Sequence, residues 1–174
     1  MAKTSARKRA LFTAAVLGVA VAGCDGERNT TATSPGAAAV ATKTLGPIEA
    51  KISVSPRARP GEKAGLSVDL TNRADSVVQL ERGIEWPPFN VVVLRPSGDT
   101  VWARNPQGLI ALVAMAPIPM EPGETRALGV VEWDLRDARG RVVDPGTYLV
   151  HAKLWIGGPQ MRGPIGPVTL TVTR

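Results

Sequence analysis

The chain has 174 residues, of which 44% are hydrophobic, and a formal net charge of +6 at pH 7, which is enough chain for one folded domain. It contains one cysteine and one histidine, so these residue types cannot supply the three or four ligands of a typical zinc site. Beyond Arg9 no run of lysine or arginine forms the basic footprint of a nucleic-acid-binding protein. We therefore expect no metal, no cofactor and no nucleic-acid partner.

Residues 1–23 have the organisation of a secretory signal peptide. An apolar run of twelve residues from Ala10 to Val21 is followed by small residues and preceded by four basic ones, Lys3, Arg7, Lys8 and Arg9. Such a run is too short for the hydrocarbon core of a bilayer, which takes about 20 residues, but it suits the central part of a signal peptide. We expect this segment to be absent from the mature protein, whose charge is then only weakly basic.

The sequence VAGC at residues 21–24 resembles the lipobox of bacterial lipoproteins, in which the cysteine receives a diacylglyceryl group and the signal is cut just before it. The resemblance makes Cys24 the lipidation site and membrane lipid a partner, although Val21 stands where leucine is commoner. Asp25 resembles a signal that retains lipoproteins at the periplasmic face of the inner membrane; otherwise the outer membrane or the cell surface is expected. The alternative is a secreted protein with an unmodified cysteine.

Residues 24–46 are predicted to form a flexible linker that carries the lipidated cysteine. This stretch is rich in Thr, Ala, Ser and Gly and has no sustained apolar period. The remaining residues, 47–174, are predicted to form a single domain.

The pattern of this domain predicts strands throughout. Residues 66–70 and 168–172 alternate apolar and polar side chains, which is the period of a half-buried strand. Residues 89–104 read as a hairpin whose turn contains Pro96, Gly98 and Asp99. Turn-forming segments recur between short apolar segments, and no helical period is present. We therefore expect an all-β antiparallel sandwich.

The segment DPGTYLVHAKLWI, residues 144–156, refines that expectation. Tyr148 comes just after an Asp-Pro-Gly turn, which resembles the tyrosine corner of immunoglobulin-like sandwiches. Its ring is expected in the core and its hydroxyl bonded to the backbone. The same alternation places His151 and Trp155 on the opposite face. The predicted fold is an immunoglobulin-like β-sandwich preceded by a signal peptide and a linker.

Four phrases in order over residues 60–155 carry a family resemblance: PFNVVVLRPSGDTVW, MEPGET, VVEWD and VVDPGTYLVHAKL. Together they resemble the BsuPI family, bacterial immunoglobulin-like domains named as intracellular proteinase inhibitors. The resemblance implies a protein partner, with a protease as the family-level expectation. The family pattern transfers no inhibitory residue to this chain, and Pro88 stands where the family often has aspartate. The matching positions are Phe89, Val91, Gly98, Trp102, Pro122, Gly123, Glu124, Trp133, Pro145, Gly146 and Tyr148.

Catalytic chemistry is not expected, so we predict that the protein is not an enzyme. His151 is the one histidine base, and no G-x-S-x-G nucleophile motif accompanies it. The aspartates of residues 134–144 lack the spacing of a calcium loop and alternate with arginines, which predicts a self-neutralising solvated turn. Glu121 and Glu124 flank a Pro-Gly pair and are expected to form a charged turn that keeps a strand edge soluble.

Four residues are the candidates for partner binding. Met161 and Arg162 lie at the tip of the predicted loop 157–167, and binding residues concentrate on loops held by a rigid scaffold. Trp86 lies in a connection before two prolines, and Trp155 is predicted on the outward face of its strand. The alternatives are a surface loop without a partner and tryptophans that pack in the core or cover an edge.

The sequence thus leads to a lipid-anchored, extracytoplasmic protein-binding module, with proteinase inhibition implied by the family resemblance. The alternative is a non-inhibitory structural or accessory module of a cell-envelope complex. No oligomeric state is predicted.

Overall fold

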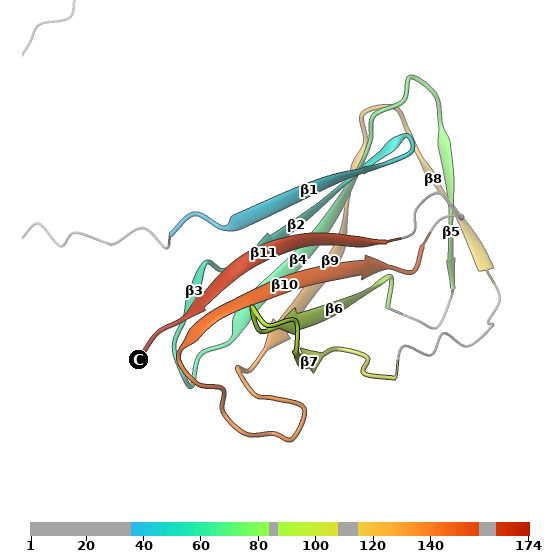
Figure 1. Cartoon of the computed structure of the whole chain (residues 1–174). Coiled ribbons are helices and arrows are strands. Elements are labelled where there is room, and N and C mark those ends of the chain that lie inside the picture. The colour runs from blue at the N-terminus through green and yellow to red at the C-terminus, as the bar shows by residue number, and fades with distance from the viewer. Residues whose placement is uncertain (1–35, 84–86, 108–114, 157–162) are drawn as a thin grey trace, which may run out of the picture. The chain divides into compact units, whose positions relative to one another are not determined.

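A computed structural model describes residues 36–83, 87–107, 115–156 and 163–174 (Figure 1). These residues belong to one compact unit, Thr33–Arg174. None of the described residues is helical, and among them there is no helix that could span a membrane. The strands are β1 (Ala39–Leu45), β2 (Ile48–Val54), β3 (Arg57–Ala58), β4 (Ala64–Asn72), β5 (Val78–Gly83), β6 (Phe89–Leu94), β7 (Thr100–Ala103), β8 (Met115–Met120), β9 (Thr125–Trp133), β10 (Gly146–Leu154) and β11 (Pro164–Val172).

Two sheets form a sandwich, as predicted. One has the strand order β1-β2-β4-β9 and the other the order β3-β11-β10-β6-β7. A separate ribbon of β5 and β8 lies at one end of the sandwich (Figure 1). Neighbouring strands are antiparallel, except that the short β3 runs parallel to β11. The predicted 89–104 hairpin is the β6–β7 pair, in which β7 ends at Ala103.

The core lies between the two sheets and follows the predicted alternation. Residues 66, 68 and 70 of β4 and residues 168, 170 and 172 of β11 are buried, and the residues between them are not. Trp133 is fully buried, and its ring lies 6.2 Å from that of the half-buried Trp102 and 5.7 Å from that of Tyr148. Burying aromatic and aliphatic side chains is the main stabilising term of such a sandwich.

The prediction of a linker over residues 24–46 is wrong for its last part, which forms the strand β1. Every residue of Ala39–Leu45 pairs with β2, so the domain begins before residue 47 and this part of the chain is not a flexible linker. Ala39 and Ala41 pack against the core, and the ammonium group of Lys43 donates a hydrogen bond of 3.0 Å to the carbonyl of Pro164. Backbone pairing with β2 holds this strand, and such pairing is not visible in composition.

The predicted loop 157–167 is shorter than expected, because β11 begins at Pro164. Pro164 is the first residue of the strand, and Pro167 lies where the β10–β11 register shifts. These are the positions at which a strand tolerates proline, which has no backbone N–H to donate. A proline-rich segment therefore does not exclude a strand here.

Candidate functional site

Of the predicted site residues, the structure describes Trp155. Cys24, Trp86, Met161 and Arg162 lie outside the described residues. Trp155 is half-buried on the outward side of the chain after β10, and its backbone N–H donates a hydrogen bond of 2.9 Å to the carbonyl of Pro88. This bond joins the end of β10 to the connection that leads into β6.

Apolar side chains cover the outward side of the five-stranded sheet around Trp155. Leu149 lies opposite Leu94, and His151 lies opposite Val92, in the β10–β6 register. These side chains alternate with the buried ones of the same strands, and each is half-buried. We refer to Val92, Leu94, Leu149, His151 and Trp155 as the outer β10 face; the exposed Lys153 lies on the same side of the strand, between His151 and Trp155.

The outward side of the four-stranded sheet is different in character. Lys51 and Asp69 form an ion pair of 3.1 Å across β2 and β4, and Ser53 lies opposite Ser67. An antiparallel sheet with water on one side normally carries such polar residues there. The apolar outer β10 face departs from this rule and is therefore a candidate contact surface.

His151 contributes to this face as a largely apolar group. Its Nδ1 atom is buried and has no hydrogen-bond partner among the described residues. Burial lowers the pKa of His151, because the charged imidazolium loses its hydration. The neutral ring is therefore favoured at neutral pH, and the geometry gives this histidine no hydrogen-bonded partner at Nδ1 to orient it as a base.

A second surface is a groove of about 240 Å³ between the β6–β7 turn and the loop 134–143. The loop is firmly attached: Leu135 and Val143 are buried, and the indole N–H of Trp133 donates to the carbonyl of Arg136 at 2.8 Å. The backbone N–H of Ala138 donates to the carbonyl of Val101 at 3.0 Å, so the loop contacts β7. We call this the arginine groove; it is lined by Arg95, Asp99, Thr100, Val101, Asp137, Ala138, Arg139 and Arg141.

The carboxylates of the arginine groove are already engaged. Asp137 accepts hydrogen bonds from the Arg141 guanidinium at 2.7 and 2.9 Å, and these bonds lower the pKa of Asp137 to about 2. Asp99 accepts a hydrogen bond of 2.7 Å from the hydroxyl of Ser97. The predicted self-neutralising turn is therefore present at Asp137 and Arg141. Among the described residues, no group of three acidic, cysteine or histidine side chains could hold a metal ion.

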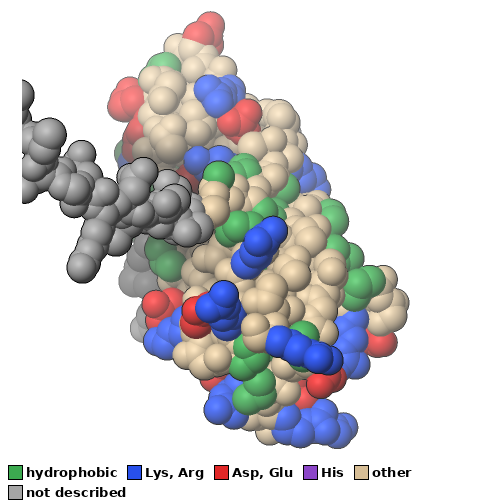
Figure 2. Space-filling model, turned by 90° about the vertical axis from the view of Figure 1, so that its left-hand side faces the viewer, with side chains coloured by type: hydrophobic (Ala, Val, Ile, Leu, Met, Phe, Trp, Pro, Cys, Tyr) green, Lys and Arg blue, Asp and Glu red, His purple; other side chains and the backbone are tan. Residues whose placement is uncertain are grey.

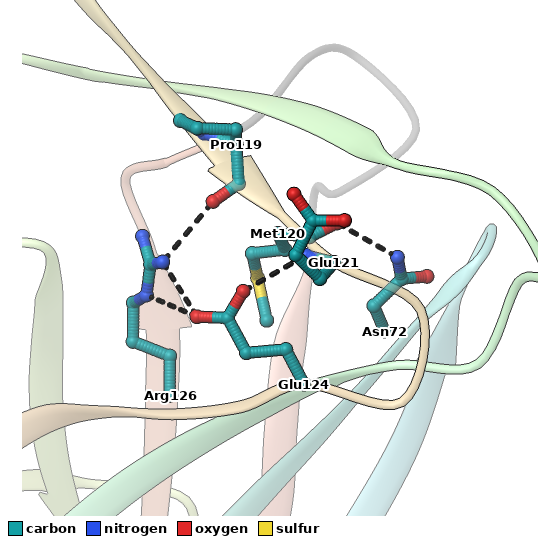
Figure 3. Close-up of polar contacts among 6 residues, drawn as sticks. All are labelled: Asn72, Pro119, Met120, Glu121, Glu124 and Arg126. Carbon is teal, nitrogen blue, oxygen red and sulfur yellow. Dashed lines mark hydrogen bonds and ion pairs between the residues drawn. The ribbon is translucent and has the colours of Figure 1, made fainter.

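Glu121 and Glu124 lie in the predicted charged turn, where Glu124 stabilises the backbone (Figure 3). Glu124 accepts a hydrogen bond of 2.8 Å from the backbone N–H of Glu121, which lowers its pKa, and it is also bonded to Arg126. Arg126 donates in turn to the carbonyl of Pro119 at 3.1 Å. The carboxylate of Glu124 is thus used structurally.

Asn72 is a structural residue that the sequence did not single out. It is fully buried, and its amide donates to the carbonyl of Ser76 and, as Figure 3 shows, to that of Met120, both at 2.9 Å. Its side-chain oxygen accepts the N–H of Ala74. The sequence feature that could have indicated this role is the position of Asn72 at the end of an alternating strand.

Comparisons with known proteins give likenesses to solved structures alone. No family model and no curated protein matches it. Among solved structures it is similar to β-glucosidase from Listeria innocua, with 14% identity, a TM-score of 0.41, and coverage of 75% of this chain and 16% of that chain. It is also similar to the CARDB domain of a Pyrococcus furiosus protein in complex with di-metal ions, with 10% identity, a TM-score of 0.38, and coverage of 79% and 90%. The BsuPI resemblance stays a prediction from the sequence.

Proposed function

We propose that this protein is a lipid-anchored, extracytoplasmic module that binds another protein through the outer β10 face. The observation that supports this function is the apolar character of that face, where Leu149 and Leu94 lie side by side on the outward side of a sheet. Aromatic residues with a large apolar surface, such as Trp155, are enriched at the centres of protein interfaces. The lipid anchor rests on the VAGC sequence that ends at Cys24.

A protease is the partner class that the BsuPI resemblance implies, and inhibition is the form that binding would then take. In that case the purified protein should slow a protease of its compartment without being consumed. If the capture described next yields an envelope assembly and no protease is slowed, the module is an accessory one and the inhibitory form is wrong.

The binding experiment uses the full chain, expressed with its signal and extracted in neutral detergent. Wild type, Leu149→Ala and Trp155→Ala are used to capture partners from envelope extract, which are identified by mass spectrometry. Loss of an interface anchor worth about 2 kcal/mol should weaken capture roughly thirtyfold. Val130→Ala is the matched control, because Val130 is 69% exposed on β9 of the other sheet. Equal capture by all four proteins would overturn this assignment.

The anchor has its own test. Labelled fatty acid should enter the wild-type protein and not Cys24→Ser, because serine has no thiolate to accept the lipid. Equal labelling of the two proteins would contradict lipidation at Cys24 and leave the outer β10 face to be judged by the capture experiment.

A further inference from the structure

Two arginines of the arginine groove come from separate segments and have no counter-ion. Arg95 begins the β6–β7 turn, and Arg139 lies in the loop 134–143. Neither guanidinium has a hydrogen-bond or ion-pair partner among the residues that the structure describes. Asp137 is paired with Arg141, whereas Asp99 accepts a hydrogen bond from the neutral hydroxyl of Ser97 and keeps its negative charge. The three arginines and two aspartates that line the groove thus give it a formal net charge of +1.

The backbone beneath these arginines is held by closed turns. The N–H of Arg95 donates to the carbonyl of Asp99, and the N–H of Gly98 donates to the carbonyl of Arg95, both at 2.9 Å. In the loop, the carboxylate of Asp137 accepts the N–H of Arg139 at 2.8 Å. Binding an anion would therefore cost mainly side-chain ordering.

The chemistry of the groove suits a phosphate oxyanion. A guanidinium presents a planar fork of donors that matches phosphate in a bidentate manner. Arg95 and Arg139 come from the two segments that bound the groove, so their side chains can approach one phosphate from two sides. A volume of about 240 Å³ accommodates a phosphate with its ester groups.

The groove lies at the end of the sandwich where the chain enters the domain from Cys24. Ala39, the first residue of β1, pairs with Val54 of β2, which pairs with Leu66 near the start of β4. The start of β4 pairs with the end of β9 at Trp133, which leads directly into the loop 134–143. Figure 2 looks onto this end and shows Lys and Arg side chains spread over its lower half, with Asp and Glu side chains between them.

The length of the chain allows this end to lie at the membrane that the anchor would occupy. Fully extended, the chain from Cys24 to Ala39 reaches at most about 50 Å. We propose that the arginine groove binds the phosphate of an anionic phospholipid headgroup in the membrane that holds Cys24. This inference rests on the lipid anchor proposed above, and it assigns the domain an orientation in which the groove faces the bilayer.

The test separates headgroup binding from the anchor by using the full chain with Cys24→Ser. Flotation is measured with phosphatidylcholine vesicles with and without phosphatidylglycerol. Each basic residue near an anionic surface raises the partition coefficient onto the vesicles about fivefold. Adding Arg95→Gln and Arg139→Gln should therefore reduce the increase in partitioning that phosphatidylglycerol causes roughly 25-fold. Residues 1–23 also bind vesicles, through their apolar run and through Lys3, Arg7, Lys8 and Arg9, but this contribution is common to all variants, which are therefore compared by their ratio to the Cys24→Ser protein.

The matched control is Lys153→Gln, which removes a positive charge from an exposed position of β10 away from the groove. This substitution should change the partitioning onto phosphatidylglycerol vesicles by no more than the loss of one distant charge does. An effect as large as that of the arginine pair would overturn the groove as a specific site, because net charge would then explain the binding.

A competition arm identifies the source of the phosphate. Inorganic phosphate should displace the Cys24→Ser protein from phosphatidylglycerol vesicles more strongly than chloride at equal ionic strength. If phosphate binds in an Arg95-dependent manner while flotation is independent of phosphatidylglycerol, the ligand is a soluble phosphate and the headgroup proposal is wrong. If fatty-acid labelling of Cys24 fails while this flotation persists, the anchor is wrong and the headgroup site stands.

Discussion

The hydroxyl of Tyr148 donates a hydrogen bond of 2.6 Å to the backbone carbonyl of Asp144, four residues earlier. The ring of Tyr148 is buried and meets the ring of Trp133 edge-on at 5.7 Å. The predicted tyrosine corner is therefore confirmed: one side chain fixes the turn before β10 to the core. Burial of the hydroxyl also raises the pKa of Tyr148, so it remains a donor at neutral pH.

Tyr148→Phe should lower the free energy of unfolding by about 1 kcal/mol, because it removes one hydrogen bond and leaves the ring in place. Tyr148→Ala should lower it by about 3–5 kcal/mol, because it also opens a cavity beside Trp133. Thermal and urea unfolding followed by tryptophan fluorescence measure both changes. Two variants that unfold like wild type would contradict this role of the corner.

Asn72→Ala should destabilise the domain by about 2–4 kcal/mol. It leaves the buried carbonyl of Met120 without its donor, which costs about 1–3 kcal/mol, and it removes the part-buried hydrogen bonds to the Ser76 carbonyl and the Ala74 N–H, worth about 0.5 kcal/mol each. Ser76→Ala is the matched control, since it keeps the backbone carbonyl that Asn72 contacts. Urea unfolding should show a loss for Asn72→Ala alone; equal stability of the two variants would show that the bonds add nothing.

Asp137 should make stability depend on pH in the acid range. Its pKa is about 2 in the folded protein against an ordinary 3.8, so the unfolded chain binds the proton more tightly. The stabilisation is complete above pH 3.8 and is lost as pH falls from there through about 2. In urea unfolding over this window, Asp137→Asn and Arg141→Gln should both show a flatter decline than wild type. A decline as steep as that of wild type would remove Asp137 as its source.

The segment between β10 and β11 gives a further test of partner binding. Replacing Met161 and Arg162 together with serine should change the free energy of unfolding by no more than about 0.5 kcal/mol, as surface substitutions do. If this segment adds to the outer β10 face, the double variant should lose most captured partner, measured with envelope extract as above. Trp86→Ala is compared in parallel, and a loss confined to that variant would move the site to the connection before β6.

Much of the sandwich was determined by the sequence alone. The two-residue period of 66–70 and 168–172 predicts which residues are buried, because successive side chains of a strand point to opposite faces whichever strand lies beside it. The same holds for Tyr148, whose corner is set by the turn four residues before it. Local periodicity and turn chemistry decide these features.

The tertiary structure decided what depends on pairing between distant segments. β1 forms from an Ala- and Thr-rich stretch because its backbone hydrogen-bonds to that of β2. β11 contains two prolines because one is the first residue of the strand and the other lies at a register shift. The outer β10 face joins Leu94 to Leu149, and the arginine groove joins Arg95 to Arg139, across 55 and 44 positions of the chain. Composition and the period of apolar residues reflect local geometry. The outer β10 face and the arginine groove depend on strand order and loop packing, which cannot be read from a single sequence.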